Sequence, residues 1–140
     1  MMLCVSYLPP ASSGGCPTDV EGYFMRWQLE VAEAEAEGPV LTGVDSNARV
    51  GKEPDWPEAE EGDWAVRESA DEQVNSHGRR LLSMCQASTL RICNGRVKGS
   101  TSGAATSFGA LGNGSSVVDL WLASTSLLHL LPWLEVARNS

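Results

Sequence analysis

The chain has 140 residues, of which 42% are hydrophobic and 20% charged, and its formal net charge is -8. This length and composition are typical of one globular domain and exclude a disordered chain. The acidic excess is local, because nine of the eighteen acids lie in residues 53–72, whereas residues 73–118 contain five bases and no acid. A basic face and scattered solvated arginines are both compatible with this distribution.

Cysteine spacing and hydropathy indicate the compartment. The four cysteines show no CxxC spacing and no nearby histidine, so they indicate reduced thiols or small core residues, not a disulfide framework or a zinc site. The N-terminus lacks the basic and apolar regions of a signal peptide, and the most apolar run, 120–134, is too interrupted and short to span a bilayer. We therefore expect an intracellular protein, nuclear or cytoplasmic, that is neither secreted nor transmembrane.

The first forty residues predict a β-α-β unit. Residues 3–7 form an apolar run that ends before two prolines, which favours a strand followed by a loop. Thr18 and Glu21 predict a capping box, and apolar residues at helical spacing predict an amphipathic helix over 19–37. A second strand at 39–42 then lies parallel to the first.

Residues 52–72 combine acids, prolines and two tryptophans without periodicity. We interpret this segment as a long, exposed, acidic insertion loop. Trp56 and Trp64 either pin it to the surface or contact a partner, and we favour the pinning role because buried aromatic residues are chiefly packing residues.

The later elements are a helix at 76–87, strands at 90–93, 106–108 and 116–122, a short helix at 125–131 and a last strand at 134–137. Asp119 lies inside the clearest of these strands. An unpaired carboxylate is costly to bury, so Asp119 must face solvent, a cation or a hydrogen-bond donor. The polar face of an edge strand explains it as well as a site does.

Asp45 and Asn47 follow the strand at 39–42 directly. Ligands bind beyond the carboxyl ends of strands in open α/β sheets, which makes a carboxylate and an amide at this place candidates for chemistry. Asp and Asn also close Asx turns by bonding their own backbone. The local pattern alone favours the turn.

Four segments follow one another along the chain: SYLPP at 6–10, GVDSNARVG at 43–51, NSHGRRLLSMCQASTLRICNGR at 75–96 and SSVVDLWLAS at 115–124. In this order they resemble the endonuclease/exonuclease/phosphatase superfamily, in its non-LTR retrotransposon endonuclease branch. The resemblance implies an α/β (α+β) fold, a four-layer arrangement in which a β-sandwich is flanked by helices. Residues 1–140 would form the C-terminal portion of that domain, truncated at both ends, with 52–72 as an insertion.

The resemblance also implies a Mg²⁺-dependent phosphodiesterase that cleaves DNA. Tyr7 would lie at the rim of the site and contact the scissile phosphate. Asp45 would orient or deprotonate the attacking water, and Asn47 would donate a hydrogen bond to the phosphate. Asp119 would fix the tautomer of an active-site histidine.

The departures from the family pattern predict little or no activity. Val44 separates Gly43 from Asp45, where the family has Gly-Asp directly, so we expect an altered turn. The family's metal-binding Glu and catalytic His have no counterpart in the chain. We expect His77 and His129 to have ordinary structural roles. We therefore expect this chain to bind Mg²⁺ weakly and to be inert or nearly so.

Two other functions remain open from the sequence. The first is a non-catalytic interaction module, which binds a protein partner through 52–72 or associates with itself or a partner through an uncovered sheet surface. The second is a phospholipid or inositol phosphate phosphodiesterase of the same superfamily.

Overall fold

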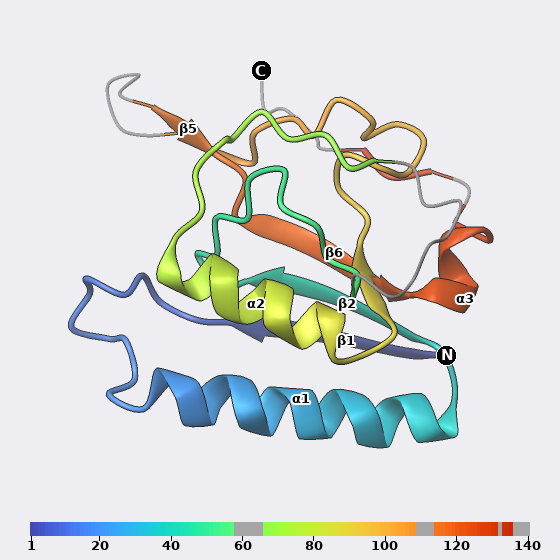
Figure 1. Cartoon of the computed structure of the whole chain (residues 1–140), viewed down its shortest axis with the longest axis horizontal. Coiled ribbons are helices and arrows are strands. Elements are labelled where there is room, and N and C mark those ends of the chain that lie inside the picture. The colour runs from blue at the N-terminus through green and yellow to red at the C-terminus, as the bar shows by residue number, and fades with distance from the viewer. Residues whose placement is uncertain (58–65, 109–113, 132, 136–140) are drawn as a thin grey trace.

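The computed structural model describes residues 1–57, 66–108, 114–131 and 133–135, and these residues form a mixed α+β architecture (Figure 1). A four-stranded sheet and a two-stranded sheet are combined with helices. The elements are β1 Met2–Tyr7, α1 Val20–Glu37, β2 Val40–Asp45, α2 Ser76–Gln86, β3 Leu90–Ile92, β4 Ser107–Phe108, β5 Ser115–Ser116, β6 Asp119–Ser124 and α3 Thr125–Leu128.

The larger sheet has the strand order β1-β2-β6-β3. β1 and β2 are parallel and are joined by α1, which confirms the predicted β-α-β unit. β6 is antiparallel to both β2 and β3. The last long strand of the chain therefore lies in the middle of the sheet, and β1 is one of its two outer strands.

Helix α1 forms where apolar residues recur at helical spacing, and it buries Phe24, Trp27, Val31 and Ala34. The predicted capping box is wrong, however. The helix begins one residue later than expected, and the side chain of Asp19 accepts a hydrogen bond of 2.8 Å from the Gly22 N–H. Aspartate is among the best N-cap residues, so it displaces the adjacent threonine.

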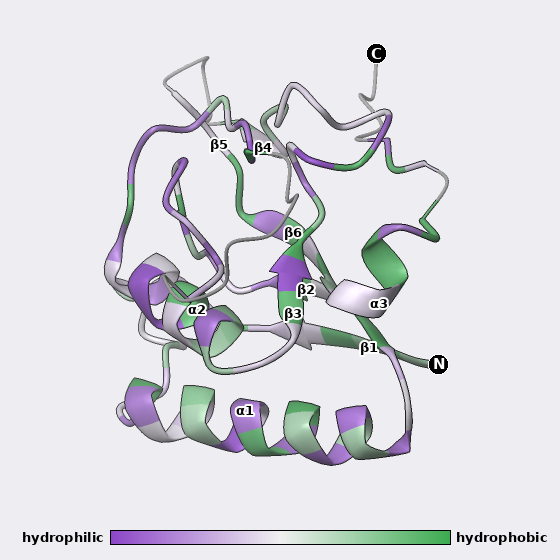
Figure 2. Cartoon of the chain, turned by 45° about the vertical axis from the view of Figure 1, so that its right-hand side comes forward, coloured by the Kyte–Doolittle hydropathy of each residue, from purple (hydrophilic) through white to green (hydrophobic). Residues whose placement is uncertain are grey.

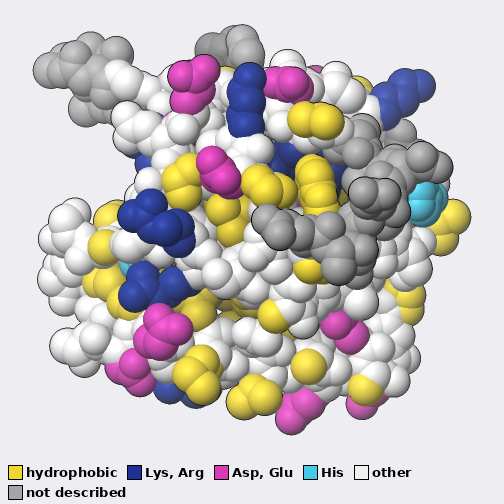
Figure 3. Space-filling view, viewed as in Figure 1, with side chains coloured by type: hydrophobic (Ala, Val, Ile, Leu, Met, Phe, Trp, Pro, Cys, Tyr) yellow, Lys and Arg dark blue, Asp and Glu magenta, His cyan; other side chains and the backbone are white. Residues whose placement is uncertain are grey.

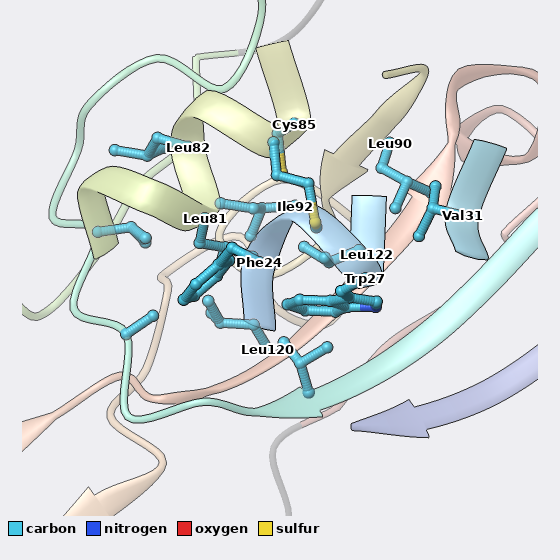
Figure 4. Packing of buried hydrophobic residues seen from close by; sticks show 14 of the residues in the cluster. Phe24, Trp27, Val31, Leu81, Leu82, Cys85, Leu90, Ile92, Leu120 and Leu122 are labelled. Carbon is cyan, nitrogen blue, oxygen red and sulfur yellow. The ribbon is translucent and has the colours of Figure 1, made fainter. Parts of the chain in front are cut away.

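α1 and α2 pack side by side on one face of the sheet, which we call the helix face (Figures 1 and 2). Alternate strand residues point into the core between helices and sheet, as the pleat requires. Figure 4 shows Phe24 and Trp27 of α1 lying against the strand residues in this core. The strand residues of the helix face are Val40, Val44, Leu90, Ile92, Leu120 and Leu122, all nearly inaccessible to solvent.

The opposite face of the sheet, which we call the open face, is only partly covered. Near β3 and β6, Trp121 and Ala123 pack with apolar residues of α3 and of the segment that follows it. On β1 nothing in the described part of the chain covers the alternate residues Leu3, Val5 and Tyr7, which are 62%, 80% and 61% exposed. The sheet therefore presents an apolar strip along β1.

The described residues of 52–72 are mostly exposed or half-buried, but they include buried acids. Asp55 and Asp71 are buried, and the Asp55 carboxylate accepts hydrogen bonds from the Arg96 guanidinium and from the Ile92 N–H. The Arg96 guanidinium also lies 5.6 Å from the centre of the Trp56 ring, which agrees with a pinning role. Trp64 lies outside the described residues. Sequence periodicity cannot detect carboxylates that are buried by partners distant in the chain.

The later strands differ from prediction in detail. The expected strand 116–122 is divided into β5 and β6, because the N–H groups of Val117 and Val118 bond to the side chains of Asp71 and Thr106 instead of to a strand. Of the expected last strand, residues 134 and 135 are not in a strand, and 136–137 lie outside the described residues.

Two broader expectations can also be compared with the structure. All four cysteines are free thiols, and two of them, Cys85 and Cys93, are buried. Among the described residues, no helix has the length and apolar character needed to cross a membrane.

Candidate functional site

Three of the four predicted site residues lie in one row across the sheet. Tyr7 at the end of β1 is in register with Asp45 at the end of β2, and Asp45 is in register with Asp119 at the start of β6. Residues in register on neighbouring strands point to the same face, and directly opposed Cβ atoms lie about 5 Å apart. Because their neighbours Ser6, Val44 and Leu120 point toward the helices, this row lies on the open face.

Asn47 lies beyond the row and is held in an unusual conformation. Its φ of 50° makes it the one non-glycine residue with positive φ in the described chain, and asparagine tolerates this region well. Its side-chain N–H donates a 2.9 Å hydrogen bond to the carbonyl oxygen of Leu8. The Asn47 amide therefore ties the loop after β1 to the loop after β2, and one of its two N–H groups remains for a ligand.

Asp45 has a raised pKa for two reasons. Partial burial of its carboxyl group raises the pKa first, and the negative charge of Asp119 raises it further. The backbone N–H of Asn47 acts on the same carboxylate and opposes the rise.

Asp119 is exposed on the open face. Its charge is tolerated within an apolar strand because the carboxylate faces solvent. Tyr7 is also exposed, while its carbonyl oxygen accepts a 3.1 Å hydrogen bond from the Tyr23 hydroxyl of α1. Both side chains are thus accessible from solvent beside the Asp45 carboxyl group.

The N-terminus of α2 holds the segment that carries the site. The Asn75 side chain caps α2 by accepting from the Gly78 N–H at 2.7 Å, accepts from the Arg49 N–H at 3.0 Å, and donates to the Asn47 carbonyl at 2.8 Å. His77 donates from Nδ1 to the Ser46 carbonyl oxygen at 3.0 Å, because a carbonyl can only accept. Asn75 and His77 are therefore positioning residues for the loop.

The sequence prediction missed Asn75 as a site-supporting residue. The signal was its place directly before an amphipathic helix, where asparagine is a strong N-cap. His77 is 1% exposed and packs against Phe24, so its predicted structural role agrees with the structure. His129 is exposed at the end of α3.

An ion pair between Arg49 and Asp71 holds the loop that follows β2. The Arg49 guanidinium binds both oxygens of Asp71, each at 2.7 Å. Burial raises the pKa of Asp71, but the hydrogen bonds from Arg49 and from the Gln73 and Val117 N–H groups outweigh it and lower the pKa overall.

The inserted Val44 has a clear structural consequence. It places Gly43 inside β2, where a Cβ atom would lie 3.3 Å from the Trp121 ring, and directs its own side chain into the core. β2 continues to Asp45, so the Asp45 carboxylate lies at the end of the strand. Whether this turn differs from that of the family stays a prediction.

The described residues offer limited means of holding a metal. They contain no group of three or more His, Cys, Asp and Glu side chains arranged around a common point. Asp45 and Asp119 are two adjacent carboxylates, and Mg²⁺ commonly binds one or two carboxylates together with waters and phosphate oxygens. The donor set therefore fits Mg²⁺ only with a phosphate or water completing it.

A basic face does not form from the acid-free part of the chain. Arg91 is buried, Arg96 pairs with buried Asp55, and Arg80 pairs with Glu21 of α1. Figure 3 shows cationic and acidic side chains adjacent where α1 and α2 meet. Most of these arginines are thus buried or paired with acids of the same chain.

Comparison with models of protein families and with curated proteins gives no match to this chain.

Proposed function

We propose that Tyr7, Asp45, Asn47 and Asp119 form the phosphate-facing part of a Mg²⁺-dependent phosphodiesterase site of the retrotransposon endonuclease type, with DNA as substrate. The fold would be part of the superfamily's four-layer sandwich. The observation that carries the proposal is the register that aligns Tyr7, Asp45 and Asp119 across three strands. The four residues come from three segments, β1, β2 with the loop that follows it, and the start of β6, and Tyr7 and Asp45 lie at the carboxyl ends of their strands, where α/β sheets bind ligands. The free thiols favour an intracellular location.

Each residue has a definite task in this proposal. In the metal-free chain, the raised pKa makes Asp45 a stronger base toward a water on the open face. The remaining Asn47 N–H and the Tyr7 hydroxyl would donate to phosphate oxygens as charge develops. Bound Mg²⁺ would supply neutralisation of the phosphate charge, with Asp45 and Asp119 as its carboxylate ligands. Two carboxylates are fewer protein ligands than tight Mg²⁺ binding needs. We therefore propose weak Mg²⁺ binding and negligible turnover by this chain.

A plasmid-nicking assay with Mg²⁺ tests this proposal. The 140-residue chain and its Asp45→Asn variant should nick at the same background rate. A version extended at both ends with the family's Glu-bearing and His-bearing segments should nick, and Asp45→Asn in that version should lower the rate by about 100-fold or more. Robust nicking by the 140-residue chain, or no effect of Asp45→Asn in the extended version, would contradict the proposal.

A second candidate, a non-catalytic interaction module, is supported by the exposed apolar strip on β1. The described part of 52–72 is a weaker candidate for the binding surface, because Asp55 and Asp71 are committed to Arg96 and Arg49. The sheet surface is therefore the better place to look for a partner.

A further inference from the structure

The outer edge of β1 has backbone groups that bond to no other described residue. The Met2 N–H donates to the Pro39 carbonyl oxygen at 3.0 Å, and the Leu8 N–H donates to the Asp45 carbonyl oxygen at 2.8 Å. In a parallel ladder, alternate residues of a strand bond to the same neighbour, so the even-numbered residues of β1 face β2. The N–H and C=O groups of Leu3 and Val5 therefore point outward, away from the sheet.

This edge lacks the features that normally prevent strand addition. Between residues 2 and 7 there is no charge, no proline and no bulge. Val5, at the centre of the strand, is 80% exposed. A strand of six residues with a free edge is a template for pairing with another extended chain.

A groove lies beside the edge, between β1 and α1. It has a volume of about 410 Å³, and its apolar lining includes Trp27, Val31 and Ala34. Three exposed glutamates of the same helix, Glu30, Glu33 and Glu37, also line it. Their spacing of three and four residues sets them in one stripe along the helix.

The glutamate stripe is not neutralised within the described part of the chain, where none of its three carboxylates has an ion-pair partner. α1 contains a single basic residue, Arg26, which does not line the groove. In Figure 1 this helix runs the length of β1, so the stripe follows the edge that a partner strand would occupy.

We propose that β1 accepts an added β-strand from a protein partner whose sequence alternates apolar residues and carries lysine or arginine at its ends. The outward groups of Leu3 and Val5 would bond its backbone, and its alternate side chains would enter the groove beside Val31. Its cationic ends would meet the glutamate stripe, which gives orientation and selectivity. The proposal rests on the interaction-module candidate and makes no use of the phosphodiesterase site.

Charge decides among the possible occupants. A second copy of this chain would bring its own uncharged β1 together with its own glutamate stripe, and the two stripes would repel each other. DNA would also be repelled by the three carboxylates. A basic strand is the occupant that the backbone edge, the apolar groove and the stripe all favour.

The test uses three capped peptides in which valine and threonine alternate. One has two lysines at each end, the second has glutamates in their place, and the third is the lysine peptide with alternate backbone nitrogens methylated. Titration of the 140-residue protein, followed by calorimetry and by amide exchange at Leu3 and Val5, measures binding. The lysine peptide should bind at least about tenfold more tightly than either of the others and should protect those amides.

Two protein variants sharpen the test. Val5→Pro removes an outward N–H without touching the β1–β2 bonds and should abolish binding, whereas the matched Val5→Thr keeps the N–H and should bind as the wild type does. Glu30→Gln with Glu33→Gln should reduce the preference for the lysine peptide to less than about threefold.

Three outcomes would overturn the proposal. Equal binding of the lysine and glutamate peptides would exclude charge selection, and equal binding of the methylated peptide would exclude strand addition. Dimerisation of the free protein that Val5→Pro abolishes, without competition from the lysine peptide, would identify a second copy as the occupant. None of these results bears on plasmid nicking, so the phosphodiesterase proposal stands or falls separately.

Discussion

At the scale of single residues, the partial burial of Asp45 and, after it, the negative charge of Asp119 opposite it disfavour the charged form of Asp45 in the folded state. The folded-state pKa of Asp45 lies above its ordinary value of 3.8. Below that value the group is protonated in both the folded and unfolded states, so no penalty exists. The penalty accumulates as the pH rises through the folded-state pKa and then stays constant.

Asp45→Asn should therefore raise the free energy of unfolding at pH 7 by up to about 0.5 kcal/mol and have no effect near pH 3. Urea unfolding at the two pH values measures this. Asp119→Asn should give part of the same gain, because it removes the opposing charge. A loss of stability at pH 7 in both variants would show that these carboxylates are not in mutual repulsion.

The buried pair of Asp55 and Arg96 should behave in the opposite way. Asp55→Ala removes the buried carboxylate that accepts from the Arg96 guanidinium and from the Ile92 N–H, and should lower the free energy of unfolding by about 3–5 kcal/mol. The matched control is Glu21→Ala, which breaks the exposed pair with Arg80 and should cost no more than about 0.5 kcal/mol. Similar costs for both variants in denaturant unfolding would contradict the burial of Asp55.

At the scale of elements, the close approach of α2 to the site loop depends on Gly78. A Cβ atom there would overlap the carbonyl oxygen of Arg49, although alanine is intrinsically a better helix former than glycine. We expect Gly78→Ala to lower the free energy of unfolding by about 2 kcal/mol or more, because the helix must move away from the loop. Gly14→Ala, where no atom lies near the added Cβ, should be neutral. Thermal unfolding of the two variants measures the difference.

Periodicity explains which elements could be predicted from the sequence. α1, α2, β1, β2 and β3 each carry an apolar repeat or run that local patterns reveal, and their predicted positions agree with the structure to within a few residues. The division of the strand at 116–122 could not be foreseen, since Val117 is drawn away by Asp71, which is 46 residues distant. The choice between Thr18 and Asp19 as the N-cap of α1 could not be foreseen either, because it depends on the residue at which the helix begins.

Site prediction was limited in the same way. Strand ends and a resemblance to a known family singled out Tyr7, Asp45, Asn47 and Asp119, and the sheet register aligns three of them. Whether they act on a phosphodiester stays a prediction. The contacts of Asn75 with two separate loop residues could not be read from spacing, because they depend on how α2 docks against the sheet.

At the scale of the whole molecule, the uncovered part of the sheet should dominate solution behaviour. Leu3→Thr combined with Val5→Thr removes two exposed apolar side chains from the strip and keeps residues that favour strands. The double variant should show less light scattering at high protein concentration, with a change in stability below about 0.5 kcal/mol. Leu29→Ala removes a similarly exposed side chain from α1 and serves as the control. Equal scattering by all three proteins would contradict a special role for the β1 strip.

The position of β6 between β2 and β3 sets the order in which a ribosome can complete the sheet. β2 ends at residue 45, whereas its second neighbour begins at residue 119, so β2 must wait for its antiparallel partner while the intervening chain is synthesised. At roughly 5–20 residues per second this interval lasts on the order of 4–15 seconds. During that time the edge of β2 that β6 later covers stays open in the nascent β1-α1-β2 unit, and an open strand edge is a template for pairing with other extended chains.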